Sequence, residues 1–174
     1  MKEGTRELSL PSLLEKPTCL EETVELIFGS DHAGFGLKEE LKNFLKQDKN
    51  HQVFDEGCFS EDRCNYPLFS QKVVQRVLSG EGRGILVCGS GIGVDMVANK
   101  YKGVRAALVR SVEEAKLSRQ HNDANILCLG SRITSFDLCK EIISAWLKEP
   151  FEGGRHSERV GMFSNIGSDP SKGF

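Results

Sequence analysis

The sequence predicts an α/β protein, a Rossmann-like, doubly wound three-layer sandwich with a five-stranded parallel sheet. Three observations predict it. Short apolar segments alternate with amphipathic segments five times along the chain. The connections are only a few residues long, so consecutive strands are expected to run parallel and to be joined by right-handed crossovers. One segment, residues 84–88, is continuously apolar and bounded by glycines, as in a strand buried on both faces of a sheet.

The individual elements follow from the period of the apolar residues. The expected strands cover residues 24–28, 52–54, 84–88, 104–109 and 125–129. Apolar residues recur three and four positions apart between them, which predicts the first, second and fifth helices over 37–45, 69–78 and 136–147. The third helix follows residues 84–88 and is expected to end near Tyr101. The sequence Ser111-Val112-Glu113-Glu114 has the form of a capping box and opens the fourth helix. One or two further helical turns are expected after Pro150.

The length of 174 residues fits one domain with extensions. Residues 1–23 contain Pro11 and Pro17 and show no sustained period, so they are predicted to be an N-terminal extension, to which we assign no role. The domain itself is expected over residues 24–160, followed by a C-terminal tail over 161–174.

Composition excludes several classes of protein. The net charge of −2 argues against general binding of nucleic acid. The longest uncharged stretch, residues 84–94, is far shorter than the roughly 18–20 residues that span a membrane. Neither the six cysteines nor the four histidines have the spacing of a metal site, so no metal is expected. The N-terminus lacks the apolar segment of a secretory signal, which favours a cytoplasmic protein with reduced thiols.

Chemistry is expected where the strands end, because parallel α/β sheets bind ligands at the carboxyl ends of their strands. Asp31 and His32 follow the first strand, Cys88 ends the third, and His121 stands shortly before the last. Each also has an ordinary explanation. Cys88 fits an inert core thiol, His121 a solvated loop histidine, and Asp31 a helix N-cap.

The glycine turn after Cys88 fails three common phosphate-loop patterns. A dinucleotide-binding turn needs glycine where Val94 stands and an acidic residue about 20 positions further on, where Val109-Arg110 stand. The Gly-Lys-Ser/Thr of a P-loop is absent, and a cysteine phosphatase would need arginine at position 94. A row of backbone N–H groups remains, able to hold an oxyanion or a phosphate. Beside it, a partly ionised Cys88 thiolate fits removal of a proton from a carbon next to a carbonyl.

Two arginines near the C-terminus favour phosphate binding. Arg155 and Arg159 are four residues apart, so on a helix both guanidinium groups face the same way. Arg132, after the last strand, could join them. The alternative is a solvated charged face on which the two arginines pair with Glu152 or Glu158.

Together these motifs resemble the type B ribose-5-phosphate isomerases, within the wider sugar-phosphate isomerase family that includes the galactose-6-phosphate isomerase subunits. The resemblance covers the chain from about Val24 to Arg159, in the family's order and spacing. The segments that carry it are Gly29-Ser30-Asp31-His32-Ala33-Gly34, Val87-Cys88-Gly89-Ser90-Gly91-Ile92-Gly93, Ala98-Asn99-Lys100, the stretch from Leu117 to Asn125 that includes Ser118-Arg119-Gln120-His121-Asn122-Asp123, Gly130-Ser131-Arg132 and Glu152-Gly153-Gly154-Arg155-His156.

The resemblance implies an aldose–ketose isomerase of the pentose phosphate pathway that interconverts ribose 5-phosphate and ribulose 5-phosphate through a cis-enediolate, without metal or organic cofactor. It implies that Cys88 is the base and that His121 opens the sugar ring, with Asp31 nearby. The expected substrate-binding residues are Asp31, His32, Tyr66, Gly89, Ser90, Gly91, Ile92, Gly93, Asn122, Arg132, Arg155 and Arg159. Of these, Ser90 and the turn amides would hold the enediolate, Asn122 the hydroxyls, and His32 and the three arginines the phosphate. Homodimers or homotetramers with each site built from two subunits are also implied.

Some alternatives stay open at this point. The substrate could instead be a hexose 6-phosphate such as that of allose or galactose. A nicotinamide-dependent oxidoreductase is disfavoured by the broken dinucleotide pattern, and a non-catalytic sugar-phosphate sensor by the intact Cys88 and His121. Three positions depart from the family pattern. Ser90 replaces a common threonine, Asn65 a usual aspartate, and Asp95 a small residue, which places a negative charge near Cys88.

Overall fold

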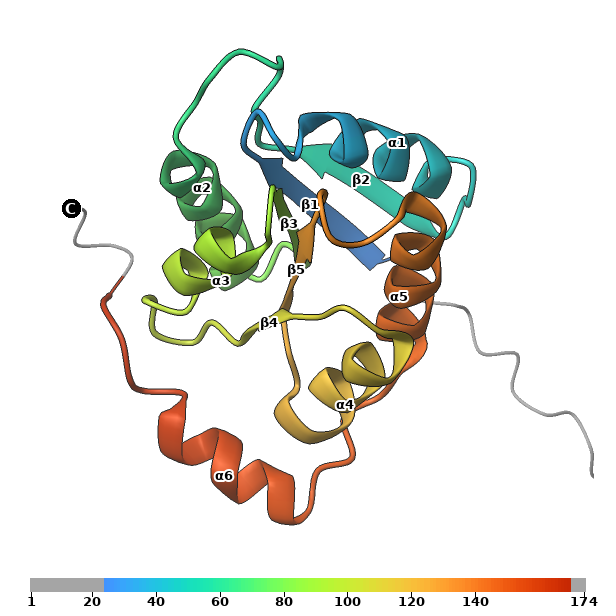
Figure 1. Ribbon diagram of the computed structural model, residues 1–174. Helices are drawn as coiled ribbons and strands as arrows, with labels where there is room; N and C mark the ends of the chain where they lie inside the picture. Colours follow the sequence, from blue (N-terminus) through green and yellow to red (C-terminus); the bar gives the residue numbers. More distant parts are fainter. Residues whose placement is uncertain (1–23, 170–174) are drawn as a thin grey trace, which may run out of the picture.

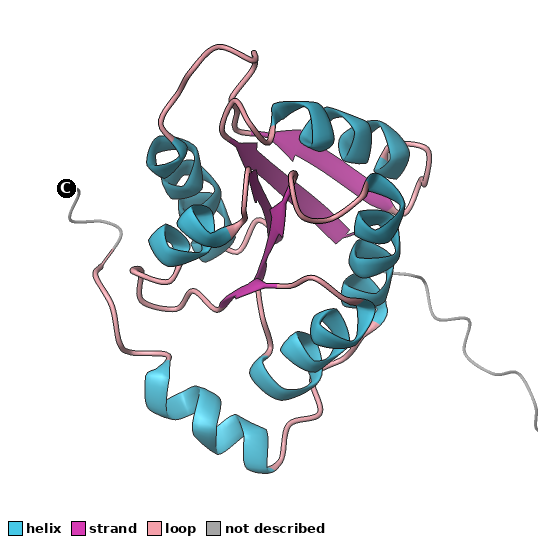
Figure 2. Ribbon diagram, in the orientation of Figure 1, coloured by secondary structure: helices cyan, strands magenta, loops and turns pink. Residues whose placement is uncertain are grey.

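The computed structural model describes residues 24–169, so the predicted extension over 1–23 and the last residues of the tail, 170–174, lie outside the described residues. Strands and helices alternate along this part of the chain (Figures 1 and 2). The elements are β1 (Val24–Ser30), α1 (Phe35–Leu45), β2 (His51–Asp55), α2 (Tyr66–Leu78), β3 (Arg83–Cys88), α3 (Ile92–Ala98), β4 (Ala106–Leu108), α4 (Val112–Asn122), β5 (Ile126–Gly130), α5 (Phe136–Lys148) and α6 (Arg155–Phe163).

The five strands form one parallel sheet in the order β2-β1-β3-β5-β4. From β1 the chain moves outward to β2 and then returns to the other side of β1 to form β3. This reversal places the topological switch point of the sheet between the carboxyl ends of β1 and β3, which is the usual ligand position in such sheets. The predicted doubly wound parallel fold is confirmed.

Helices cover both faces of the sheet, giving three layers (Figure 1). Each strand turns alternate side chains to opposite faces, so two apolar cores form. On one face the sheet packs against α1, α4 and α5, with Trp146 and Leu41 fully buried. On the other it packs against α2 and α3, with Val73 and Val94 fully buried.

Two elements differ in length from the sequence expectation. β4 has three residues rather than the six expected over 104–109. As an edge strand it pairs on one side only, and the Arg105 N–H donates to the side-chain oxygen of Asn125 at 2.8 Å instead of continuing the ladder. The helix expected after Pro150 is α6, which continues past the expected domain boundary at residue 160 to Phe163.

The chain beyond α6 returns to the main body. Ser168 forms an isolated parallel bridge with Tyr101, and its N–H donates to the Lys100 carbonyl at 2.8 Å. Before the helix, the Glu152 N–H donates to the Gln120 carbonyl at 3.1 Å, so α6 is tied to the domain on both sides. Over residues 24–169, no helix combines the length and the apolar character that crossing a bilayer requires.

Candidate active site

The carboxyl ends of β1, β3 and β5 are joined by hydrogen bonds into one surface. The Asp31 N–H donates to the Val87 carbonyl at 3.3 Å. The Ser131 N–H donates to the Cys88 carbonyl at 2.9 Å, and the Ser131 hydroxyl donates to the Ala33 carbonyl at 2.8 Å. The loops that the sequence singled out therefore meet at the carboxyl ends of β1 and β3.

Cys88 is the last residue of β3 and is only 5% exposed. It belongs to the core between the sheet and helices α2 and α3. Its sulfur accepts a hydrogen bond from the Gly91 N–H at 3.1 Å, and such a donor stabilises negative charge on sulfur. Both sequence interpretations of Cys88 thus describe part of its environment, because it ends a core strand and also receives an N–H from the glycine turn.

The glycine turn packs closely against the end of β5. Gly91 has φ 77°, and a Cβ built on it would lie 2.9 Å from the Leu129 carbonyl carbon. A Cβ on Gly130 would lie 2.7 Å from the carbonyl carbon of Ser90. Side chains at either position would push the two loops apart, so glycine is required for this approach. The Ser90 hydroxyl oxygen accepts from the Ile92 N–H at 3.3 Å.

Polar side chains border the turn. The guanidinium of Arg132 lies over Gly89, because a Cβ built on Gly89 would be 3.4 Å from the Arg132 Cζ. The ring of Tyr66 lies over Gly93, because a Cβ built on Gly93 would be 2.7 Å from the Tyr66 Cζ. The His32 Nδ1 accepts from the Cys64 N–H at 3.3 Å. The buried Asp31 carboxylate accepts from the Gly34 N–H at 2.9 Å, in the turn before α1. The N-cap residue of α1 is Gly34 and no side chain caps this helix, so the interpretation of Asp31 as an N-cap is wrong.

A second group of predicted residues lies at the end of α4 and on α6. The imidazole of His121 stacks on that of His156, with ring centroids 4.4 Å apart and ring planes 4° apart. A carboxylate oxygen of Glu152 lies 3.7 Å from the His156 Nε2. Arg155 and Arg159 lie one turn apart on α6, both exposed, and the Arg155 Nε donates to the His156 Nε2 at 3.4 Å. Burial lowers the pKa of His156, and the neighbouring His121 and Arg155 lower it further.

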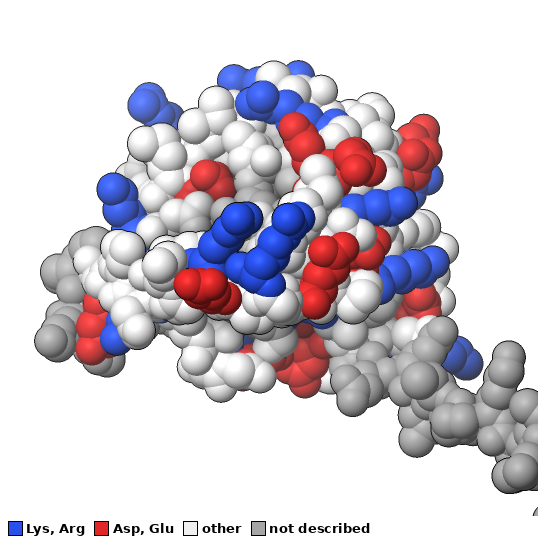
Figure 3. All heavy atoms as spheres, turned by 90° about the horizontal axis from the view of Figure 1, so that it is seen from below, with Lys and Arg blue, Asp and Glu red and all other residues white. Residues whose placement is uncertain are grey.

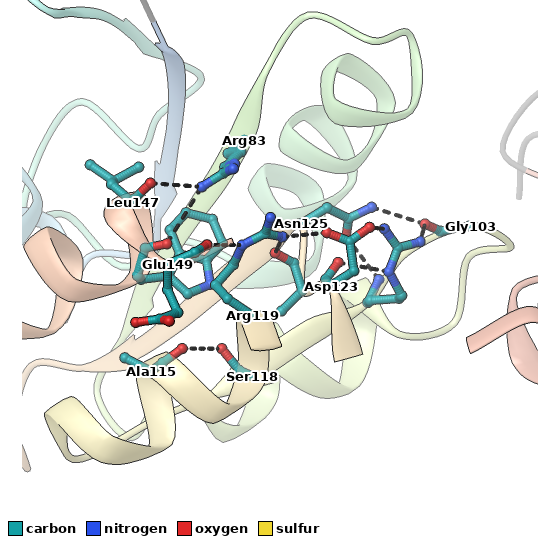
Figure 4. A network of polar contacts seen from close by, with 12 residues as sticks. Arg83, Gly103, Ala115, Ser118, Arg119, Asp123, Asn125, Leu147 and Glu149 are labelled. Carbon is teal, nitrogen blue, oxygen red and sulfur yellow. Dashed lines mark hydrogen bonds and ion pairs between the residues drawn. The ribbon is translucent and has the colours of Figure 1, made fainter. Parts of the chain in front are cut away.

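A network of arginines holds the end of α4 in place (Figure 4). Asp123, in the left-handed conformation at φ 48°, accepts from Arg119 at 2.7 Å and from Arg105 at 2.9 Å. Arg83 donates to the carbonyl oxygens of Trp146 and Leu147 at the end of α5, at 3.4 and 3.3 Å. Burial, followed by the charge of Arg119, lowers the pKa of Arg83 to about 10. The network fixes the backbone that carries His121 and the exposed Asn122.

The structure does not bring the two groups together within one chain. Cys88 is paired with Gly130, at the carboxyl end of β5. Helix α4 runs back along the sheet and ends before β5 begins, so His121 lies at the amino edge. A five-residue strand rises by about 13 Å between these edges. Figure 1 likewise shows α6 beyond the end of the sheet at which β5 begins.

Sequence reasoning missed the contacts of His156, Glu152, Asp123 and Arg105. His121 and His156 are separated by β5 and α5 along the chain, so no spacing in the sequence indicates that they stack. The hydrogen bonds of Arg105 to Asp123 are equally a product of the fold, because β4 and α4 meet only once the sheet has formed.

The comparisons with known proteins agree with one another. A family model described as Ribose/Galactose Isomerase matches residues 26–163. The chain is 44% identical to ribose-5-phosphate isomerase B of Escherichia coli K12, over 82% of this chain and 95% of that protein. It is 35% identical to a galactose-6-phosphate isomerase subunit of Clostridium acetobutylicum, over 76% of each. A crystal structure of a ribose 5-phosphate isomerase from Thermotoga maritima superimposes with a TM-score of 0.79 at 44% identity, covering 81% of this chain and 97% of that one.

Proposed function

The chain belongs to the ribose/galactose isomerase family, and from this premise we propose that it interconverts ribose 5-phosphate and ribulose 5-phosphate. The names of the relatives from E. coli and T. maritima, each 44% identical, support this substrate. The observation that carries the proposal is the position of Cys88, at the carboxyl end of β3 with a backbone N–H on its sulfur at 3.1 Å.

In the proposed reaction Cys88 acts as the base. The open-chain aldose has its carbonyl at C1 and a hydrogen on C2. The Cys88 thiolate removes the C2 proton, and the electron pair moves into a C1–C2 double bond while the C1 oxygen becomes negative. The backbone N–H groups of the turn and the Ser90 hydroxyl hold that oxygen. The C2 hydroxyl proton passes to the C1 oxygen, and Cys88 returns its proton to C1, which gives the ketose with a hydroxyl at C1 and a carbonyl at C2.

The remaining predicted residues divide between the ring and the phosphate. His121 opens the furanose ring by exchanging a proton with its oxygen, with Asp31 nearby, and Asn122 contacts the hydroxyl groups. His32, Arg132, Arg155 and Arg159 bind the phosphate, because guanidinium groups match its oxygens with paired N–H donors. Tyr66, whose ring covers Gly93, borders the glycine turn on one side.

We further propose that the active unit is a homodimer, two of which can form a tetramer, with each site built from both subunits. The separation of Cys88 from His121 supports this, because the two can act on one sugar only if they come from different copies. An apolar surface beside the glycine turn also supports it. Ile92 and Met96, one turn apart on α3, are 45% and 61% exposed, and Leu68 at the start of α2 is 56% exposed. Exposed apolar groups of this kind mark interfaces.

A cytoplasmic location is the setting that we propose for this dimer. The five cysteines that the structure describes are all free thiols, which fits a reducing compartment. Reduced sulfur is also what the proposed role of Cys88 requires.

A second substrate class is favoured by one observation, the relative named as a galactose-6-phosphate isomerase subunit. A coupled assay of the purified full chain with ribose 5-phosphate, allose 6-phosphate and galactose 6-phosphate tests both. We expect the highest kcat/KM on ribose 5-phosphate. A higher value on either hexose phosphate would replace the pentose with that sugar, and no turnover of any of the three would reject the isomerase.

A further inference from the structure

We propose that His121, Glu152 and His156 form a binding site for a transition-metal dication such as Zn²⁺, and that its occupation inhibits the enzyme. The binding half stands on the geometry of these three side chains. The inhibitory half rests on the proposed function, in which His121 opens the sugar ring. The sequence expectation that the reaction itself uses no metal is unaffected.

The three side chains already place one possible ligand atom each close together. One ligand atom from each of them lies within 4.8 Å of the other two. Zinc–nitrogen bonds of 2.0–2.1 Å place two ligand atoms of a tetrahedral site about 3.4 Å apart. The two imidazole planes are nearly parallel and their centroids lie 4.4 Å apart, so both rings must rotate before their nitrogen lone pairs converge on one ion. The exposed carboxylate of Glu152, 3.7 Å from the His156 Nε2, supplies the third ligand.

The chemistry of the donors selects the metal. Two imidazoles and one carboxylate are the protein ligands of many zinc sites that keep a fourth position open. The exposed guanidinium groups of Arg155 and Arg159 lie on the same helix, and Figure 3 shows basic and acidic side chains side by side on the face of the molecule seen from below. Positive charge nearby opposes the binding of every dication, so the donor atoms decide the selectivity. Imidazole binds Mg²⁺ and Ca²⁺ poorly and binds Zn²⁺, Ni²⁺ and Cu²⁺ strongly.

Occupation of this site would remove two groups from the reaction. A nitrogen of His121 that is bonded to a metal cannot exchange a proton with the sugar. Arg155 would also have to leave the His156 Nε2, to which it now donates at 3.4 Å. We therefore expect inhibition that a chelator reverses and that a phosphorylated sugar opposes.

The binding half is tested with Co²⁺, which reports its ligands by absorption. The full chain, freed of metal by a chelator, is titrated with Co²⁺, and Zn²⁺ affinity is measured by calorimetry. Glu152→Gln should weaken binding by about tenfold or more, because one of three ligands is lost. Glu158→Gln is the matched control, since it removes the same charge from an exposed position on α6. Unchanged Zn²⁺ affinity in Glu152→Gln, or a sulfur-to-cobalt charge-transfer band in the wild-type protein, would overturn the site.

The inhibitory half is tested in the isomerase assay. Zn²⁺ should inhibit the wild-type protein and Glu158→Gln, and inhibition of Glu152→Gln should need about tenfold more Zn²⁺, in line with its weaker binding. Equal inhibition of all three would show that Zn²⁺ acts elsewhere, with Cys88 the obvious ligand. If the metal-free wild-type protein is inactive on every sugar, the proposed function fails, while the Co²⁺ titration still decides the metal site.

Discussion

Cys88 and His121 lie at opposite edges of the same parallel sheet in a single chain. Cys88 is level with Gly130, where β5 ends, whereas His121 precedes the start of β5 at Ile126. If both act on one sugar, the two residues belong to different copies of the chain. This relationship makes the assembly of the site testable without a further structure.

Mixing two inactive variants should restore activity. In a mixed dimer of Cys88→Ala and His121→Ala, one site lacks both residues and the other has both. If subunits exchange at random in a two-fold dimer, about a quarter of the wild-type activity should return. The measurement is the isomerase rate after the two variants are unfolded and refolded together. A mixture no more active than the separate variants would place Cys88 and His121 of one chain in one site, or deny one of them its role.

Replacing Cys88 alone should stop the reaction without preventing binding. A general base contributes about 100-fold to 10⁴-fold, so kcat of Cys88→Ala should fall at least 100-fold while the substrate dissociation constant changes little. Single-turnover kinetics and calorimetry measure the two quantities. Cys64→Ala, which removes a partly exposed thiol, serves as the control and should keep nearly full activity. A Cys88→Ala variant with a tenth of the wild-type kcat would rule out the base.

Replacing Arg159 should mainly weaken binding of the phosphate. Its exposed guanidinium makes no hydrogen bond or ion pair to another described residue, so its loss should leave the fold unchanged. We expect Arg159→Ala to raise KM for ribose 5-phosphate by about tenfold or more, the loss of a charge-assisted hydrogen bond. Lys46→Ala removes one positive charge from an exposed position next to α1 and is the control. An unchanged KM in Arg159→Ala would contradict the phosphate role.

Acid should remove the stabilising effect of Asp55. Burial by itself would raise the pKa of Asp55, but hydrogen bonds from Lys38 and Lys42 outweigh it and hold the pKa below 3.8. The Lys38 ammonium is fully buried and lies 2.7 Å from the Asp55 carboxylate. Because the folded pKa is below the unfolded value, this stabilisation is complete above about pH 4 and is lost as the pH falls through the folded pKa.

The variant Asp55→Asn tests this claim. It leaves the Lys38 charge buried beside a neutral amide, which should cost roughly 3–5 kcal/mol of unfolding free energy at pH 7. The cost should shrink as the wild-type carboxylate becomes protonated. Urea unfolding of both proteins between pH 7 and pH 2.5 measures the difference, and a difference that stays constant over this range would assign the stabilisation to groups other than Asp55.

Several features of the fold could be predicted from the sequence because they depend on local patterns. The serine cap expected at Ser111 is present, with the Ser111 hydroxyl oxygen accepting from the Glu114 N–H at 3.1 Å. The Glu114 carboxylate accepts from the Arg110 N–H at 2.6 Å rather than from the Ser111 N–H, so the second bond of the capping box is shifted by one residue. The apolar period placed α1 and α5, because a helix that covers a sheet must bury a stripe of its own side chains. The length of β4 is shorter than the apolar pattern predicts, because Val104 and Val109 do not show that this strand lies at the edge of the sheet and has only one neighbour.

The candidate site also has one part that the sequence predicts and one part that it does not. The strand-end loops could be predicted to meet, because parallel strands present their carboxyl ends at one edge of the sheet. The stacking of His121 on His156 could not, since it depends on where α6 lies after the chain has crossed β5 and α5.

From the sequence by itself came the order of strands and helices, the cysteine beside a glycine turn and the likeness to sugar-phosphate isomerases. These properties depend on neighbouring residues and on the period of the apolar ones. Only the tertiary structure decided that Cys88 is held by the Gly91 N–H, that His121 lies at the far edge, and that Glu152 joins two stacked imidazoles. Contacts between distant segments arise from the packing of whole elements, and no local pattern encodes them.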